Sequence, residues 1–272
     1  DDVEEALKSN NWQYIRDGDN YYVVGDDCIK VANIFPGKVE VRRPMADGVL
    51  NKNEDKKLVV LAEIIKASIG QAPDSNSWVC TCVSSDSIDG SADSTFHRNR
   101  LTALFTRLGW KVKILEEAHA VVLSERPTII EEDGTVVPYS GIGVSFGAGR
   151  VNCLLAYKGL PVIGMSVARS GDWVDKQVCE QTGVAISQII SAKEKKLDFN
   201  NLDDNDDVIF ALNAYYDSMI EYVFKNFGKK FQEVKSQFNQ PLDIVIAGGT
   251  SMPKGFCEKL EKIVRGLQLP FQ

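Results

Sequence analysis

Residues 141–167, GIGVSFGAGRVNCLLAYKGLPVIGMSV, decide the fold that this 272-residue sequence predicts. Their apolar runs predict three consecutive strands, the first two joined by the tip Gly147-Ala148-Gly149 and the third following Gly159. Glycines in such a tip leave backbone N–H groups uncovered, so the tip can wrap an anion, most often a phosphate. A tight β-turn also uses glycine, and that interpretation stays open for the tip taken by itself.

A second glycine pair lies well downstream. The segment 244–256, IVIAGGTSMPKGF, predicts a buried strand that turns through Gly248-Gly249 into a helix. Glycines there let a flat base or a ribose approach, and the start of a helix offers free N–H groups. The alternative is a turn that only packs a helix against its strand. We expect the last helix to run from Pro253 to Gly266.

Two further motifs place charged groups at strand ends. The segment 115–123, LEEAHAVVL, puts two carboxylates where a strand ends and a helix begins, which is where ligand sites of open α/β sheets lie. A carboxylate there can orient an attacking water or accept its proton, and the alternative is a favourable contact with the helix dipole. In the segment 168–178, ARSGDWVDKQV, Gly171 and Asp172 open a helix, with capping as the alternative role.

Composition is that of an ordinary globular protein, with 44% hydrophobic and 25% charged residues. The net charge of −7 and the lack of a dense Lys/Arg cluster argue against a nucleic-acid partner. No apolar run reaches membrane-spanning length, so no integral membrane segment is expected. We expect His97 on a helix surface. The scattered cysteines favour small buried thiols in a reducing cytosol over a metal site: Cys28, Cys80, Cys82, Cys153, Cys179 and Cys257.

The order of the predicted elements indicates an α/β fold. A buried strand over 78–83, a helix over 94–108, a strand over 111–115 and a helix from 116 to 123 alternate as in a largely parallel sheet. The segment 131–139, EEDGTVVPY, is typical of a domain boundary. Further strands are expected at 21–24 and 38–42, and further helices at 55–67, 171–182, 184–197 and 206–237.

In this order the motifs resemble the actin, heat-shock-chaperone and sugar-kinase ATPase superfamily, and MreB-type bacterial actins most of all. GVSFGAGRVN, 143–152, is similar to the family's second phosphate loop, and AGGTSMPKGF, 247–256, resembles its adenosine loop. LEEAHAVVL resembles the connecting segment, with Glu117 at the position of the water-positioning acid. The other similar segments are RRPMADGVL at 42–50, SGDWVDKQV at 170–178 and SAKEKKL at 191–197.

The resemblance implies a two-lobed actin-like ATPase fold with a nucleotide cleft between the lobes. Lobe I would cover 1–139, with an outer subdomain near 1–44, and lobe II would cover 140–272, with an inserted helical subdomain near 173–239. The implied cofactors are ATP or ADP and Mg²⁺. The residues implied at the nucleotide are Gly147, Ala148, Gly149, Arg150, Gly171, Asp172, Lys193, Glu194, Gly248, Gly249, Thr250 and Met252.

The resemblance also gives these residues separate roles. The tip 147–150 would contact the phosphates, with Arg150 pairing with them directly. Residues 171–172 would read the phosphate state at a helix start. Residues 248–250 would border the adenosine, and Lys193 with Glu194 would flank the base. Glu117 would position the attacking water.

Departures from the family pattern weigh on the expected function. Ser145 stands where relatives carry an Asp that holds the Mg²⁺ shell, and Asn152 stands where the chaperones have another Asp. The family's first phosphate loop, DxGT, and its last helix are not in the sequence, so we expect either a fragment or a degenerate member. Nucleotide binding is therefore better supported than hydrolysis.

We expect a cytoplasmic, actin-like ATP-binding protein that self-associates into nucleotide-regulated cytoskeletal filaments. The filament role rests on the family likeness, because a fold does not fix a function. Three alternatives stay open: a chaperone-type ATPase, a small-molecule kinase, and an actin-like scaffold that does not hydrolyse nucleotide.

Overall fold

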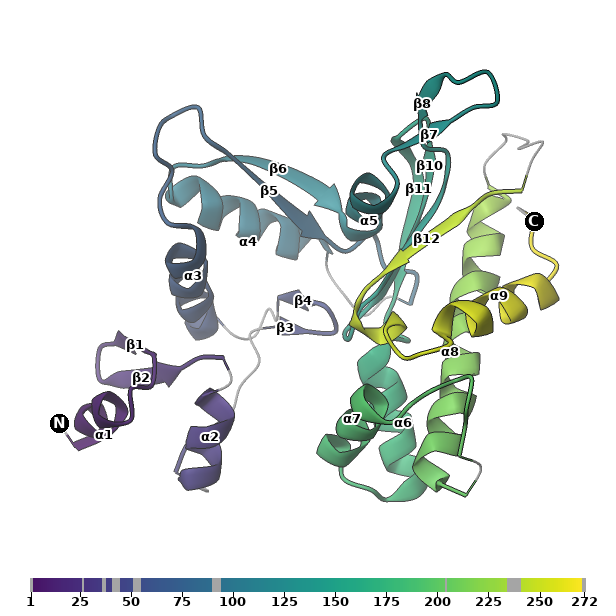
Figure 1. Cartoon of the computed structure of the whole chain (residues 1–272). Coiled ribbons are helices and arrows are strands. Elements are labelled where there is room, and N and C mark those ends of the chain that lie inside the picture. Colours follow the sequence, from purple (N-terminus) through teal and green to yellow (C-terminus); the bar gives the residue numbers. More distant parts are fainter. Residues whose placement is uncertain are drawn as a thin grey trace. The chain divides into compact units, whose positions relative to one another are not determined.

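The computed structural model describes residues 2–25, 27–35, 38–40, 45–50, 55–89, 94–203, 205–233 and 241–270. The chain forms two compact units, and Figure 1 labels the elements of both. Unit 1 comprises Asp1–Ala46, Leu50–Val79 and Arg100–Val112. Unit 2 comprises Asp47–Val49, Cys80–Asn99 and Lys113–Gln272. The lobes predicted at 1–139 and 140–272 have other bounds, and they stay a prediction.

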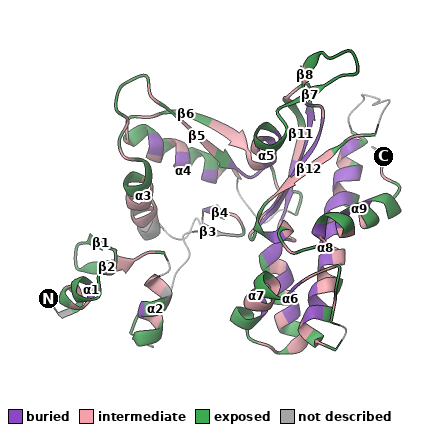
Figure 2. Cartoon of the chain, in the orientation of Figure 1, coloured by how far each residue is buried: buried purple, intermediate pink, exposed green. Residues whose placement is uncertain are grey.

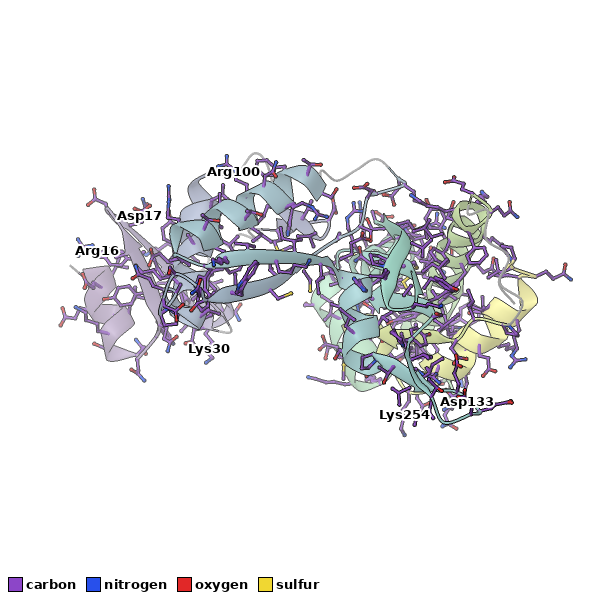
Figure 3. All side chains as sticks on the ribbon, turned by 90° about the horizontal axis from the view of Figure 1, so that it is seen from above. Arg16, Asp17, Lys30, Arg100, Asp133 and Lys254 are labelled. Atoms are coloured by element: carbon purple, nitrogen blue, oxygen red, sulfur yellow. The ribbon has the colours of Figure 1, made fainter. Side chains whose placement is uncertain are left out.

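Unit 1 begins with a helix that packs on a small hairpin. Its elements are α1 (Asp2–Ser9), β1 (Tyr14–Asp17), β2 (Asn20–Val23), α2 (Asp27–Ile34), β3 (Met45–Ala46) and α3 (Asp55–Ile69). β1 and β2 pair antiparallel. The Glu4 carboxylate on α1 accepts hydrogen bonds from the hydroxyls of Tyr14 and Tyr21 and from the guanidinium of Arg16, which Figure 3 labels. These bonds fix α1 on the hairpin.

A second, two-stranded sheet consists of β5 (Trp78–Val83) and β6 (Lys111–Glu116), with α4 (Ser94–Arg107) between them in sequence. The prediction that the first strand is buried is wrong. Trp78 is 63% exposed, and Cys80 and Cys82 are also exposed, because alternate side chains of a strand point to opposite faces. Among the six cysteines only Cys153 is buried. His97, expected at the surface, is buried too, and this burial lowers its pKa.

The centre of unit 2 is a four-stranded sheet. Its strands are β9 (Gly141–Phe146), β10 (Val151–Tyr157), β11 (Leu160–Val167) and β12 (Ile244–Ala247), in the order β11-β10-β9-β12. The first three form an antiparallel meander, as the hairpin motif predicts, whereas β12 runs parallel to β9. The largely parallel sheet was predicted for residues 78–123 and stays a prediction there. The links 147–150 and 158–159 are too short for the crossover that parallel neighbours need.

Helices cover both faces of this sheet. They are α5 (Glu117–Glu125), α6 (Gly171–Thr182), α7 (Ile186–Lys195), α8 (Asp207–Phe231) and α9 (Phe256–Gly266). Cys153 and Leu155 of β10 join the large apolar core formed with α6, α8 and α9, whereas Leu154 and Ala156 face α5 and pack with Val122. Buried residues are concentrated on β9, β10 and α8, as Figure 2 shows for this part of the chain. Removing this apolar surface from water stabilises unit 2.

The remaining short elements in the described residues are β4 (Val49–Leu50), the hairpin strands β7 (Thr128–Ile130) and β8 (Val136–Pro138), and the 3₁₀ turn η1 (Gly249–Ser251). β3 and β4 are joined by Asp47 and Gly48, whose φ angles of 50° and 71° are those of a type I′ turn. In the β7–β8 loop, Asp133 accepts the Thr135 N–H at 2.9 Å, and Figure 3 shows its side chain pointing outward.

Most helix predictions agree with the structure, and the differences lie at helix ends and in one predicted strand. α6 has the predicted bounds. α9 begins at Phe256 instead of Pro253, because η1 and Gly255, with a φ of 76°, precede it. α8 ends at Phe231, and part of its predicted continuation to residue 237 lies outside the described residues. Lys38–Glu40, the described part of the predicted strand 38–42, forms no strand.

The N-terminus of α8 offers a test of local stability. The Asp206 carboxylate caps the helix by accepting the N–H groups of Val208 and Ile209 at 3.0 and 3.2 Å. Asp206→Ala should lower the free energy of unfolding by about 1 kcal/mol in urea denaturation, because two helix donors lose their acceptor. Asp206→Asn keeps an oxygen in place and should retain most of that stability. An equal loss in both variants would contradict the cap.

Candidate functional site

The two glycine loops predicted from the sequence meet in unit 2. The Thr250 hydroxyl in η1 donates to the Gly147 carbonyl of the β9–β10 tip at 3.0 Å, and the Gly171 N–H at the start of α6 donates to the same carbonyl at 3.2 Å. A Cβ on Gly171 would overlap the Thr250 hydroxyl. Three segments far apart in sequence therefore converge at one junction.

The carbonyls of the tip accept hydrogen bonds from the start of α6, whereas two of its backbone N–H groups have no acceptor among the described residues. The Ala148 carbonyl accepts the Asp172 N–H at 2.8 Å and the Ser170 hydroxyl at 2.5 Å. Within the described part of the chain, the N–H groups of Ala148 and Gly149 have no hydrogen-bond acceptor. Ala148 is exposed. Two adjacent backbone donors without an acceptor are typical of an anion site.

The second glycine loop is hydrogen-bonded to α8 on one side and accessible to solvent on the other. The buried Tyr216 hydroxyl on α8 donates to the Thr250 carbonyl at 3.1 Å. Gly248 has a φ of 110°, and a Cβ there would overlap the Phe146 carbonyl, so this position requires glycine. A Cβ on Gly249 would meet no atom within 4 Å, and Met252 is 81% exposed. The loop is thus open to solvent at Gly249 and Met252, beside the tip.

Arg150 is engaged inside the protein. Its guanidinium is 2% exposed and donates to the Asp47 carbonyl at 2.7 Å and to the Ser166 hydroxyl at 2.8 Å. Asp89 lies 4.0 Å from it. Burial lowers the pKa of the guanidinium, and Asp89 opposes that effect. In this structure Arg150 ties the Asp47 turn to β11, and its predicted phosphate contact remains a prediction.

Lys193 also makes an internal ion pair. Its ammonium lies 2.6 Å from Asp175 Oδ2, and both side chains are nearly buried. Asp175 follows Gly171 by one turn of α6, and its Oδ1 is buried with no hydrogen-bond partner. Desolvation raises the pKa of Asp175, while the hydrogen bond from Lys193 lowers it. Glu194, beside Lys193 on α7, is exposed. The α6–α7 contact therefore depends on a buried charge pair.

Glu117, the expected water-positioning acid, is half-buried and surrounded by donors. Ser84 donates to its Oε1 at 3.3 Å, and the Asn152 amide donates to its Oε2 at 2.9 Å. Desolvation raises the pKa of Glu117, and hydrogen bonds from Ser84 and Ser145 oppose this shift. Ser145 and Asn152 are directly paired across β9 and β10, so both side chains point to the face that carries α5.

The comparisons with known proteins identify the class first. A structure of MreB 5 of Spiroplasma citri bound to AMPPNP matches with a TM-score of 0.65 and 14% identity, over 94% of this chain and 80% of that one. The ethanolamine utilization protein EutJ from Carboxydothermus hydrogenoformans matches with a TM-score of 0.54 and 12% identity, over 83% and 71%. The chain therefore has the mixed α/β actin-like ATPase fold, which confirms the predicted fold class.

The family follows from the sequence. The Volactin family model matches residues 1–272, and the chain belongs to the Volactin family. No curated protein matches the chain. Among the described helices, none combines the length and the apolar character needed to cross a bilayer.

Several residues around the site carried no usable signal in the sequence. Ser84 and Ser85 lie in a polar segment after β5 and contact Glu117 and Glu116 only through the fold. Asp175 is a mid-helix acid whose burial depends on Lys193. The Asp47-Gly48 pair is different, since that dipeptide is a known signal for a type I′ turn. It would have identified the turn, though not its contact with Arg150.

A pair of glycine substitutions tests this geometry. Gly248→Ala should lower the free energy of unfolding by about 2 kcal/mol or more, because alanine is strained at a positive φ and its Cβ would overlap Phe146. Gly249→Ala should change it by less than about 0.5 kcal/mol, since the space there is open. Both values come from chemical denaturation. A neutral Gly248→Ala would show that the loop differs from this structure.

Proposed function

We propose that this protein binds ATP and ADP, and that the bound nucleotide controls its assembly into actin-like filaments. The observation that carries the proposal is the hydrogen bond from Thr250 to the Gly147 carbonyl, which joins the two glycine loops. One loop offers free backbone donors and the other an open surface, so a ligand with an anionic end and a flat end fits both. The MreB 5 structures, which are bound to AMPPNP and to ADP, support this choice of ligand.

The phosphate end would lie on the tip. The free N–H groups of Ala148 and Gly149 are the proposed donors, because the amides of Gly171 and Asp172 already donate to tip carbonyls. The start of α6 would thus respond to the phosphates through the tip. Arg150 would support the tip from inside the protein, through its bond to the Asp47 carbonyl.

The adenosine end would lie over the second loop. Gly249 has room for a ribose or base, and the exposed Met252 side chain offers an apolar, polarisable surface. Glu194 is accessible for a contact at the edge of the base. Lys193 would act there either after leaving Asp175 or by holding α7 in place.

Hydrolysis is the less supported part of the proposal. Glu117 would orient a water and accept its proton, and its raised pKa suits a base. Mg²⁺ prefers carboxylate and carbonyl oxygens, yet Asn152 and Ser145 present hydrogen-bond donors to Glu117. These residues do not fit a divalent cation. A second candidate is therefore a scaffold that binds nucleotide tightly without turnover.

Nucleotide binding can be tested with a variant that leaves the fold unchanged. Gly249→Ala in the full-length protein should weaken binding of a fluorescent ADP analogue at least tenfold, because the new methyl group occupies the open surface. Gly266→Ala, at the end of α9, is the matched control, since its Cβ would also meet nothing within 4 Å. Equal affinities for the wild-type protein and both variants would exclude this surface as the nucleotide site.

Assembly needs its own measurement. We expect the full-length protein to pellet in high-speed sedimentation with ATP and to pellet less with ADP or without nucleotide. Turnover of ATP, measured in the same samples by phosphate release, separates an ATPase filament from a scaffold. If no nucleotide state supports assembly at any concentration tried, the filament role is wrong even where nucleotide binds.

A further inference from the structure

The carboxylate of Glu117 is held by a residue whose own orientation is fixed. Asn152 lies on β10 and is fully buried. Its Oδ1 accepts the backbone N–H of Ser85 at 3.0 Å, and its Nδ2 donates to Glu117 Oε2 at 2.9 Å. A backbone N–H can only donate, so the oxygen of the amide must face Ser85 and the NH₂ group must face Glu117. Glu117 is therefore constrained to accept.

Ser84 and Ser85 form a short polar segment after β5, the Ser84–Ser85 strap, and this strap acts on both oxygens of Glu117. Ser84 donates to Oε1 directly, and Ser85 acts on Oε2 through Asn152. The strap is fixed to the sheet, because the Ser166 hydroxyl on β11 donates to the Ser85 carbonyl at 2.8 Å. The position of the strap backbone thus determines the orientation of the Glu117 carboxylate.

We propose that Asn152 is a positioning residue for Glu117: it fixes the carboxylate as a hydrogen-bond acceptor and couples its orientation to the Ser84–Ser85 strap. The functional importance of this device rests on the proposed role of Glu117 as the group that orients water. The positioning of Glu117 by Asn152 itself requires only contacts that are present in the protein without ligand.

Charged and titratable groups around Glu117 define what a change at Asn152 would do. The Arg150 guanidinium favours the ionised form of Glu117. Glu117 contributes to the raised pKa of the exposed Cys82 on β5, after partial desolvation of the thiol and the nearby Cys80. Glu116 precedes Glu117 and is hydrogen-bonded by the Ser85 hydroxyl. With these groups unchanged, removal of the Asn152 donor leaves the ionised form of Glu117 less stabilised.

Asn152→Asp is the sharpest test. An aspartate keeps an oxygen for the Ser85 N–H but replaces the donor to Glu117 by a second carboxylate. The two carboxylates then titrate as a pair, and the higher apparent pKa of the pair, followed by ¹³C NMR of glutamate-labelled full-length protein and assigned with Glu117→Gln, should lie at least about one unit above the wild-type Glu117 pKa. Asn152→Ala removes both hydrogen bonds and should raise the Glu117 pKa by less.

Asn213→Asp on α8 is the matched control. It makes the same chemical change where Lys259 donates to the side-chain oxygen at 2.6 Å, and the titration of Glu117 should not move. A merely structural role for Asn152 predicts a loss of thermal stability with an unchanged Glu117 pKa, and that result overturns the proposal. If Asn152→Asp does not fold, the Asn152→Ala titration decides in the same way.

Turnover separates this inference from the proposed function. Where ATP is hydrolysed, the acidic limb of the pH–rate profile should shift upward in Asn152→Asp together with the Glu117 titration. A Glu117 shift without any nucleotide binding supports the positioning role and counts against the proposed function. Nucleotide binding with an unshifted Glu117 supports the function and counts against the positioning role.

Discussion

Close backbone approach at the junction of the two glycine loops is the constraint on which the candidate site depends. Gly147 supplies a carbonyl to both Thr250 and Gly171, and Gly171 has no room for a side chain. Gly248 similarly lies against the Phe146 carbonyl. These contacts hold the tip carbonyls against η1 and the start of α6.

The register of the sheet beneath this junction determines which polar side chains meet Glu117 on the opposite face. The antiparallel register pairs Ser145 with Asn152, and both side chains emerge on the face covered by α5. Glu117 opens that helix, so its carboxylate meets the neutral donors Asn152 and Ser145. One sheet thus supports two different environments, one at the tip and one at the carboxylate.

The sequence predicted the elements that local pattern controls. The hairpin strands, α6 and the strand–Gly–Gly turn follow from apolar runs and glycines, and the family resemblance supplied the fold class that the comparisons confirm. The exposure of Trp78 and the burial of His97 were predicted wrongly, because each depends on which face of its element turns inward. The internal roles of Arg150 and Asp175 depend on contacts from distant segments, and no local pattern encodes them.

The way α6 begins has a mechanical consequence. The backbone N–H groups of Gly171 and Asp172 donate to the carbonyls of Gly147 and Ala148. The start of the helix and the tip are therefore connected by two hydrogen bonds. A tilt of α6 would therefore reorient the peptide groups 147–148 and 148–149, which carry the N–H groups of Ala148 and Gly149. Under the proposed function, release of an anion from the tip would be coupled to rotation of α6, and the buried Asp175–Lys193 pair would transmit that rotation to α7.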